Sequence, residues 1–297
     1  FKALLGALTS AAQRRLVFGT QHGLLNVGLS VGTLAAAVLI GPGTVTRFQF
    51  LYVRHAASFL LAAALLRFVP SDRPSAHAES AIPAEVVSSA TTPASPTASY
   101  RDVLADRTFR RVCLLQAPLV VFGYAQYHAA LPIVLSRPGA MRPADIALVF
   151  AVNTVIVAGL AIPVAVGTRA VARSRLLVAG ELCFALCWLL LASTSPLGGS
   201  GPAVALAAVA AAVMGIGETL LSPSLGPLAN DLASPQLRGR YNSIDALVLS
   251  LGSIAGPGLT ALLFGTGSIS VFLVTLAAGC LDAVAVALGR TMRQISG

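Results

Sequence analysis

The ionisable residue with the clearest chemical potential is Glu218, which lies within the apolar stretch 201–229. A charged group in the middle of a bilayer costs roughly 3 kcal/mol, so it is usually retained for a function. A carboxyl group held away from water can take up and release a proton, as proton-driven membrane processes require. The alternative is a structural glutamate that hydrogen-bonds to a neighbouring helix. We predict that Glu218 is the proton-coupling residue.

A second set of polar side chains lies in the apolar stretch 110–135. Tyr124, Tyr127 and His128 have the i, i+3, i+4 spacing that places side chains on one face of a helix. Aromatic rings with hydroxyl groups suit an amphipathic organic substrate. The alternative is an aromatic belt at the membrane interface. With the amide side chains of neighbouring segments, the predicted substrate-cavity residues are Tyr124, Gln126, Tyr127, His128, Asn153 and Asn26.

Several chemistries are excluded by residues that the sequence lacks. Lys2 is the only lysine, so no GxxxxGK[ST] phosphate loop exists and an ATP-driven pump is excluded. None of the four cysteines has metal-site CxxC spacing, so we expect neither a metal nor a cofactor. The GLSVG string at 28–32 matches a hydrolase motif, but it lies in a continuous apolar stretch rather than at a strand-to-helix turn. We therefore expect no enzymatic activity.

The composition indicates the medium that surrounds these residues. Hydrophobic residues make up 56% of the 297 positions and charged residues only 10%, against about 25% charged in soluble domains. Continuous apolar runs of bilayer length without period-2 alternation predict membrane-spanning helices. The fold class is thus an all-α polytopic membrane protein with about eight spans. The predicted spans lie near 17–40, 47–68, 110–135, 143–166, 175–194, 201–229, 241–264 and 268–289.

The basic residues are distributed unequally between the two sides of these spans. Sixteen of the twenty Lys and Arg residues fall in segments on the side of the N-terminus, three fall in loops on the other side, and Arg54 lies within a span. Positive charge gathers on the cytoplasmic side of membrane proteins. We therefore expect both chain ends to be cytoplasmic in a multi-pass protein of the plasma or inner membrane. The net charge of +9 then needs no nucleic-acid partner.

A stretch rich in Pro, Ser, Ala and Thr interrupts the spans at 70–99 and predicts a flexible cytoplasmic linker. It separates two spans in 1–69 from six spans in 100–297. Ser99, followed three residues later by Asp102, predicts a helix N-cap. The short helix that begins there, YRDVLADRTFRR, is expected to lead into the third span.

A faint internal repeat relates the two parts of the chain. When the beginning of the chain is aligned with its last third at one constant offset, Arg14 matches Arg238, Gly28 matches Gly252, and Gly32 matches Gly256. Each copy has an arginine-bearing loop followed by a span with GxxxG, a pattern of close helix packing. The first span is thus equivalent to the seventh in two related half-proteins, and four helices are expected upstream of this chain. The predicted packing and gate residues are Gly28, Gly32, Gly252, Gly256, Pro257, Arg238, Arg240 and Asp245.

The sequence resembles the major facilitator superfamily, in which twelve helices form two six-helix bundles joined by a long cytoplasmic loop. The stretch 215–263 with its RGRYN loop is similar to the tenth and eleventh helices of that family. GYAQYHAALP at 123–132 and VFAVNTVIV at 149–157 resemble the seventh and eighth helices, and 11–32 resembles the fourth-to-fifth loop and the fifth helix. The resemblance implies an N-terminally truncated transporter that begins before the fifth helix.

The resemblance implies a secondary transporter that works by alternating access around a binding site near the midplane of the membrane. Glu218 would face the central cavity, and Asp245 would anchor a cytoplasmic gate through Arg238 or Arg240. We expect a proton-coupled antiporter for the efflux of hydrophobic or amphipathic small molecules. Its partners would be that substrate, protons and the lipid bilayer. An importer or uniporter of the same fold and a non-transporting membrane protein remain the alternatives.

Overall fold

The computed structural model is helical, with no strand among the residues that it describes. These residues are 5, 9–40, 45–68, 99–137, 141–264 and 267–288. By its internal contacts the chain divides into two compact units, one formed by 1–28 with 98–297 and the other by 29–97. Helix α2 (Ala11–Ile40) begins in the first of these units and ends in the second.

The smaller unit holds the end of α2 and helix α3 (Val45–Leu66). These helices coincide with the predicted spans 17–40 and 47–68. The described side chains of α3 are exposed, among them Phe50, Tyr52 and Leu60. Residues 70–98 of the predicted linker lie outside the described residues, so its flexibility stays a prediction.

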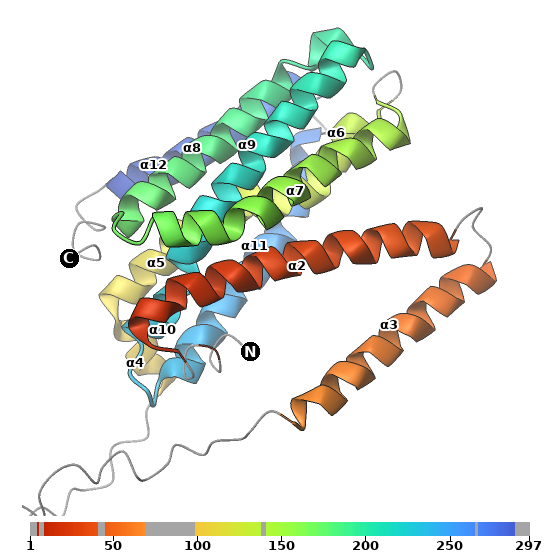
Figure 1. Ribbon diagram of the computed structural model, residues 1–297. Helices are drawn as coiled ribbons and strands as arrows, with labels where there is room; N and C mark the ends of the chain where they lie inside the picture. The colour runs from red at the N-terminus through yellow and green to blue at the C-terminus, as the bar shows by residue number, and fades with distance from the viewer. Residues whose placement is uncertain are drawn as a thin grey trace, which may run out of the picture. The chain divides into compact units, whose positions relative to one another are not determined.

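The larger unit is a bundle of long helices (Figure 1). Helix α8 packs along both α9 and α12, and α9 packs along α7. The bounds of its long elements are α5 (Arg107–Pro118), η2 (Leu119–Tyr124), α6 (Ala125–Leu135), α7 (Pro143–Gly167), α8 (Arg173–Ala192), α9 (Gly201–Leu225), α11 (Arg238–Phe264) and α12 (Ile269–Leu288). Its short elements are α4 (Tyr100–Ala105), η3 (Ser195–Leu197) and α10 (Leu228–Leu232).

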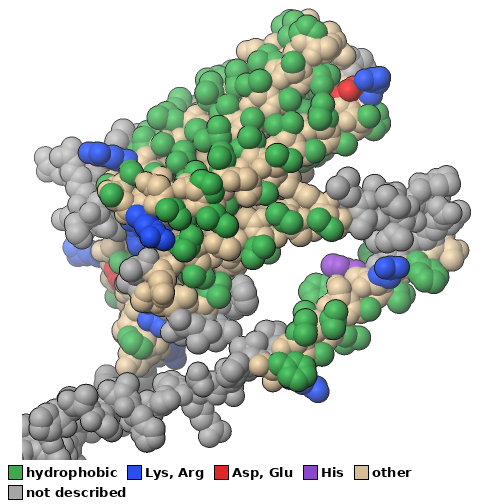
Figure 2. All heavy atoms as spheres, viewed as in Figure 1, with side chains coloured by type: hydrophobic (Ala, Val, Ile, Leu, Met, Phe, Trp, Pro, Cys, Tyr) green, Lys and Arg blue, Asp and Glu red, His purple; other side chains and the backbone are tan. Residues whose placement is uncertain are grey.

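Five helical segments of the described chain are long and apolar enough to cross a membrane. Two shorter apolar helices, Tyr52–Leu65 and Ile269–Val284, accompany them. Figure 2 shows hydrophobic side chains over the visible faces of α7, α8 and α9, with basic side chains towards their ends. Since a lipid-facing surface must be apolar, this pattern confirms a polytopic helical membrane protein. The five segments are Arg107–Leu135, Pro143–Gly167, Arg173–Leu197, Gly201–Leu232 and Arg238–Phe264.

Small residues let α8 and α9 approach closely, as is usual for helices packed in lipid. A Cβ atom on Gly180 would lie 2.5 Å from Cγ of Leu221, and one on Gly217 would lie 2.9 Å from Cβ of Cys183. The ring of Trp188, fully buried on α8, belongs to the main apolar core. This packing fixes the helix that carries Glu218.

The third span contains one turn of π-helix, η2, between α5 and α6. In a π-helix the backbone hydrogen bonds run from i to i+5, so the ordinary pairing of carbonyl groups is disturbed, and such turns are often found at functional sites. Here the indole Nε1 of Trp188 donates a hydrogen bond to the carbonyl oxygen of Phe122 at 2.9 Å. The π-helix ends at Tyr124, whose side chain it orients.

The predicted N-cap at Ser99 is confirmed. The Ser99 side chain accepts a hydrogen bond from the backbone of Arg101, and Asp102 accepts one from the backbone of Ser99. The single helix that we expected over 100–111 is instead two helices, because Asp106 caps a second helix through Thr108 and Phe109. An aspartate favours the N-cap position over the interior of a helix.

Candidate functional site

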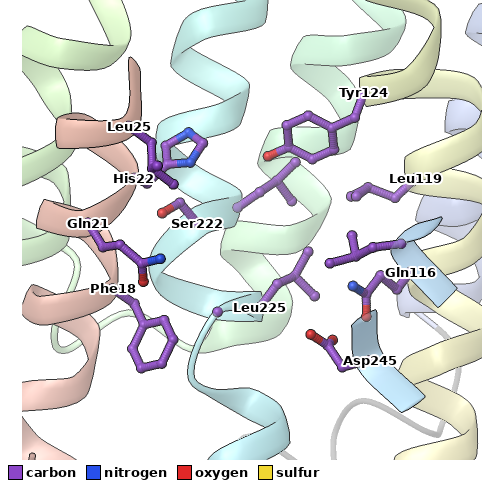
Figure 3. A pocket seen from close by; sticks show the side chains of 13 residues that line it. Phe18, Gln21, His22, Leu25, Gln116, Leu119, Tyr124, Ser222, Leu225 and Asp245 are labelled. Carbon is purple, nitrogen blue, oxygen red and sulfur yellow. The ribbon is translucent and has the colours of Figure 1, made fainter. Parts of the chain in front are cut away.

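The larger unit contains a partly open cavity of about 250 Å³ between helices from distant parts of the sequence (Figure 3). Six of its lining side chains are Phe or Leu. Five others can form hydrogen bonds, namely those of Gln21, His22, Gln116, Tyr124 and Ser222. Asp245 is the acidic residue that lines it. The lining residues are Phe18, Gln21, His22 and Leu25 of α2, Gln116, Leu119 and Tyr124 of the third span, Leu221, Ser222, Leu225 and Gly226 of α9 and its end, and Asp245 and Leu249 of α11.

Glu218 lies beside this cavity in a polar cluster built by three helices. One carboxyl oxygen accepts a hydrogen bond from Nδ2 of Asn153 on α7 at 3.0 Å. The other lies 3.6 Å from Nε2 of His22 on α2. Asn26, one turn further along α2, donates to the backbone carbonyl of His22 at 3.0 Å. The structure thus brings together three predicted site residues, Glu218, Asn153 and Asn26, around a histidine that we had not assigned to the site.

Glycines on α2 allow His22 to reach Glu218. A Cβ atom on Gly19 would lie 2.7 Å from Cβ of Ala165, and one on Gly23 would lie 3.0 Å from Cβ of Ala161. The backbone of α2 therefore lies directly against α7, the helix that carries Asn153. His22 lies between these two glycines in sequence, and its ring contacts the same carboxyl group as Asn153. The sequence signal was the spacing of small residues, which indicates a packing face.

The two ends of the cavity differ in their polar groups. Figure 3 shows the ring of His22 and the hydroxyl of Tyr124 entering from opposite sides near Ser222, whereas Gln116 and Asp245 lie together further along. Asp245 is 5% exposed, so its carboxyl group is part of the interior of the bundle. The cavity thus combines apolar walls with a few hydrogen-bonding groups, as is usual for small-molecule sites.

The predicted aromatic residues of the third span are separated by the structure. Tyr124 lines the cavity and packs edge-on against Phe184. Tyr127 is 2% exposed and contacts Phe150 within the core. His128 is exposed, and its ring packs edge-on against Tyr127. The helical spacing placed these side chains near one face, but it did not show where along that face the cavity ends.

Gln126 packs against α11 and does not line the cavity. Its Nε2 donates to the carbonyl oxygen of Gly256 at 2.8 Å, and its Oε1 accepts from the hydroxyl of Thr260 at 2.5 Å. A residue two positions from Tyr124 lies about 200° round an α-helix, so it points to a different neighbour. In this structure Gln126 joins the third span to α11, and its contact with a substrate stays a prediction.

The glycines of the predicted repeat have different surroundings. A Cβ atom on Gly252 would lie 2.7 Å from Cγ1 of Val120, and one on Gly256 would lie 2.4 Å from Cβ of Ala125, so α11 lies directly against the third span. Pro257 follows inside α11. At Gly28 and Gly32 an added Cβ atom would meet no described atom within 4 Å, and their packing role stays a prediction.

The RGRYN segment, which we expected to be a loop, is the first turn of α11, and it contacts α4 and the cap of α5. The guanidinium of Arg240 lies over the ring of Tyr100, 5.7 Å from its centroid. The hydroxyl of Tyr241 donates to Oδ2 of Asp106 at 2.8 Å. The backbone carbonyl of Arg238 accepts from Asn242 at 2.8 Å. These contacts fix the position of α11, which carries Asp245 into the cavity.

A cluster of charges, which sequence reasoning missed, joins the beginning of α2 to the other helices. Asp231 accepts from Nη1 of Arg14 at 2.5 Å and also binds Arg173. Nη1 of Arg15 donates to the backbone carbonyls of Thr168, Arg169 and Val171 at 3.0 to 3.3 Å. Burial lowers the pKa of Arg15, and the positive charge of the neighbouring Arg173 lowers it further. The signal available in the sequence was the arginine pair itself, but its partners lie more than 150 residues away.

Among the described residues, no group of three or more His, Cys, Asp or Glu side chains is placed to hold a metal ion. A search of curated proteins finds no match to the chain. The family model described as Major Facilitator Superfamily matches residues 129–295, which is more than half of the chain. That match covers α7, α8, α9, α11 and α12, among them the helices that carry Asn153, Glu218 and Asp245. The chain therefore belongs to the Major Facilitator Superfamily of membrane transporters.

Proposed function

We propose that this transporter exports hydrophobic or amphipathic small molecules in exchange for protons, and that Glu218 carries the coupled proton. The observation that carries the proposal is the Glu218 cluster. Glu218 is only 7% exposed in a helix of membrane-spanning length, and its carboxyl group contacts His22 and Asn153 beside the cavity. An ionisable side chain in such a place usually belongs to a substrate or proton pathway.

The proton would act by changing how α2 is held to α9. When Glu218 is ionised and His22 is charged, the two attract each other across 3.6 Å in surroundings that screen charge poorly. Protonation of Glu218 removes that attraction and leaves the hydrogen bond to Asn153 weaker, since bonds to charged acceptors are about twice as strong. α2 then separates from α9 more readily. A proton would thus favour one of the two conformations of alternating access.

The cavity favours an amphipathic substrate over a sugar. Six of its thirteen lining residues are Leu or Phe, and its polar groups gather in two places, one around His22 and Tyr124 and the other at Gln116 and Asp245. A sugar would need many hydrogen-bonding partners, because each buried hydroxyl group left without one costs about 1–3 kcal/mol. A molecule with an apolar body and one or two polar groups fits the arrangement without that cost.

The excess of arginine in the segments on the side of the N-terminus supports cytoplasmic positions for both chain ends, in the plasma or inner membrane.

The test is dye transport by the full-length protein in proteoliposomes. A lipophilic fluorescent cation such as rhodamine 6G and a neutral dye such as Nile red are offered with and without an imposed pH gradient. We expect gradient-driven dye movement in the wild type and a loss of at least about 100-fold in Glu218→Gln, because the amide cannot carry a proton. Asp282→Asn is the matched control, since Asp282 is an exposed acidic residue on α12.

Each alternative outcome has a separate meaning. Dye movement that is independent of the pH gradient would indicate a uniporter and contradict proton coupling. Accumulation of a sugar or another polar metabolite, with neither dye moved, would indicate an importer. Undiminished gradient-driven transport by Glu218→Gln would remove this residue from the mechanism.

A further inference from the structure

The end of the cavity that is formed by Gln116 and Asp245 has no role in the mechanism above. Gln116 lies on α5 and Asp245 on α11, and these two helices pack against each other. Both side chains line the cavity, although both residues are buried in the bundle. Figure 3 shows the carboxyl group of Asp245 beside the amide of Gln116. A molecule in the cavity therefore meets a carboxyl group and an amide at this end.

The internal repeat relates two of the helices that form the cavity. At the constant offset of the predicted repeat, Gln21 of α2 corresponds to Asp245 of α11, and Leu25 corresponds to Leu249. The structure brings all four residues to the cavity. Equivalent helices thus contribute equivalent positions to one site, as in transporters whose substrate site lies at the interface of two repeats. The equivalent positions differ in charge, because the amide of Gln21 corresponds to the carboxyl group of Asp245.

The charges around the cavity favour a positively charged ligand. Among the described residues that line it, none is a lysine or an arginine, whereas Asp245 lines it and Glu218 lies beside it. His22 is the lining residue that can become positively charged, and it lies 3.6 Å from Glu218. Charge is poorly screened in an apolar interior. The cavity therefore attracts a cation towards Asp245 and disfavours an anion.

Contacts outside the cavity hold Asp245 in place. Tyr241, one turn earlier on α11, donates a hydrogen bond to Oδ2 of Asp106 at 2.8 Å. Asn242 donates to Oδ1 of Asn230 on α10 at 2.9 Å. These hydrogen bonds fix the beginning of α11 against the cap of α5 and against α10. A charged group that is positioned before the ligand arrives need not be ordered on binding, and this raises the affinity.

We propose that the cavity binds a small organic amine in its ammonium form, with the positive charge at Asp245 and Gln116. An ammonium group has up to three N–H donors and no acceptor. The two carboxylate oxygens of Asp245 and the amide oxygen of Gln116 are acceptors that match these donors. Hydrogen bonds between charged groups are roughly twice as strong as neutral ones, so this end of the cavity sets the orientation of the amine.

The rest of the cavity suits the apolar body of such an amine. Its volume of about 250 Å³ is below the roughly 300–1,000 Å³ of sites for drug-sized molecules, so the ligand is small. Phe18 and Tyr124 supply aromatic rings, and Leu249 supplies an aliphatic surface. An apolar body placed towards His22 keeps the ammonium group away from a ring that can carry positive charge. The amine thus has one favoured orientation.

The first test is equilibrium dialysis of three probes against the full-length protein in phosphatidylcholine nanodiscs at neutral pH. The probes 2-phenylethylamine, 2-phenylethanol and phenylacetate share a ring and a short chain, and they carry a positive charge, no charge and a negative charge. Empty nanodiscs correct for uptake by the lipid. We expect the amine to bind about tenfold or more tightly than the alcohol, and the acid to bind most weakly. Equal binding of the amine and the alcohol, a preference for the acid, or binding of none of the three would overturn the proposal.

The second test asks whether Asp245 causes this preference. Asp245→Asn removes the charge and keeps the shape, so we expect the preference for the amine over the alcohol to fall to about twofold or less. Asp245→Glu keeps the charge and should retain the preference. Asp282→Asn is the matched control, because Asp282 is an exposed acidic residue on α12 that does not line the cavity. An undiminished preference in Asp245→Asn, or its loss in Asp282→Asn, would contradict an ammonium site at Asp245.

The role of the amine site in transport rests on the proposed function, and the two can fail separately. A preference for the amine that depends on Asp245, together with undiminished proton-driven dye transport in Glu218→Gln, would support the amine site and contradict the proposed coupling residue. Loss of proton-driven transport in Glu218→Gln, together with equal binding of the amine and the alcohol, would leave the coupling residue in place and overturn the amine site.

Discussion

The close approach of α11 to the third span predicts the effect of a single added methyl group at Gly256. A Cβ atom there would lie 2.4 Å from the Cβ of Ala125, whereas carbon atoms in contact are about 3.5–4.0 Å apart. Both atoms are attached directly to helix backbones and cannot rotate away. In Gly256→Ala the two helices must therefore separate by roughly 1 Å or more.

The magnitude follows from what this separation disturbs. Overpacking of a tight interior costs about 1–3 kcal/mol. The same movement stretches the hydrogen bonds of Gln126 to Gly256 and Thr260, which are 2.8 and 2.5 Å long. Each neutral hydrogen bond that is lost adds about 1 kcal/mol. We expect Gly256→Ala to lower the free energy of unfolding by about 2–4 kcal/mol.

The assay is reversible unfolding of the purified full-length protein in mixed detergent micelles. Gly258→Ala is the matched control, since an added Cβ atom at that position of the same helix meets nothing within 4 Å. We expect this control to stay within about 0.5 kcal/mol of the wild type. If Gly256→Ala were as stable as Gly258→Ala, the close packing of α11 on the third span would be refuted.

Two further predictions concern stability in detergent, measured by thermal unfolding. Trp188→Phe keeps most of the buried ring but leaves the carbonyl of Phe122 without its donor. We expect the free energy of unfolding to fall by about 2 kcal/mol. An unchanged stability would mean that this hydrogen bond is unimportant. Asp231→Asn breaks the pairs that anchor α2, and we expect a loss of about 2 kcal/mol. Asp145→Asn is the control for Asp231→Asn, because its partner Arg142 is 82% exposed, and it should cost less than about 1 kcal/mol. Equal losses in Asp231→Asn and Asp145→Asn would contradict the role of Asp231 in anchoring α2.

The membrane spans could be predicted because they depend on local composition. Apolar runs of bilayer length coincide with helices in every case, since a chain in lipid must satisfy its own backbone hydrogen bonds. The cap at Ser99 was predictable for the same reason, because its partners lie within three residues. The break at Asp106 was missed because aspartate also occurs in the first turn of helices.

The site was predictable only in part, because its geometry depends on contacts between distant segments. The place of Glu218 inside an apolar stretch could be read from the sequence, and its role stays a prediction. Its contact with His22, almost 200 residues earlier, depends on how α2 packs on α7 through Gly19 and Gly23. Helical spacing grouped Tyr124 with His128, whereas the structure turns one into the cavity and leaves the other exposed. The π-helix that orients Tyr124 has no reliable sequence signal.

Glu218 is proposed to link substrate movement to proton movement. This role is tested most directly by recording dye and proton fluxes together in proteoliposomes that hold a pH-sensitive dye. In the wild type, a rhodamine 6G gradient should drive protons in the opposite direction. In Glu218→Gln, exchange of the dye between the two sides should persist while the proton flux disappears. A Glu218→Gln protein that still moves protons with the dye would contradict the account.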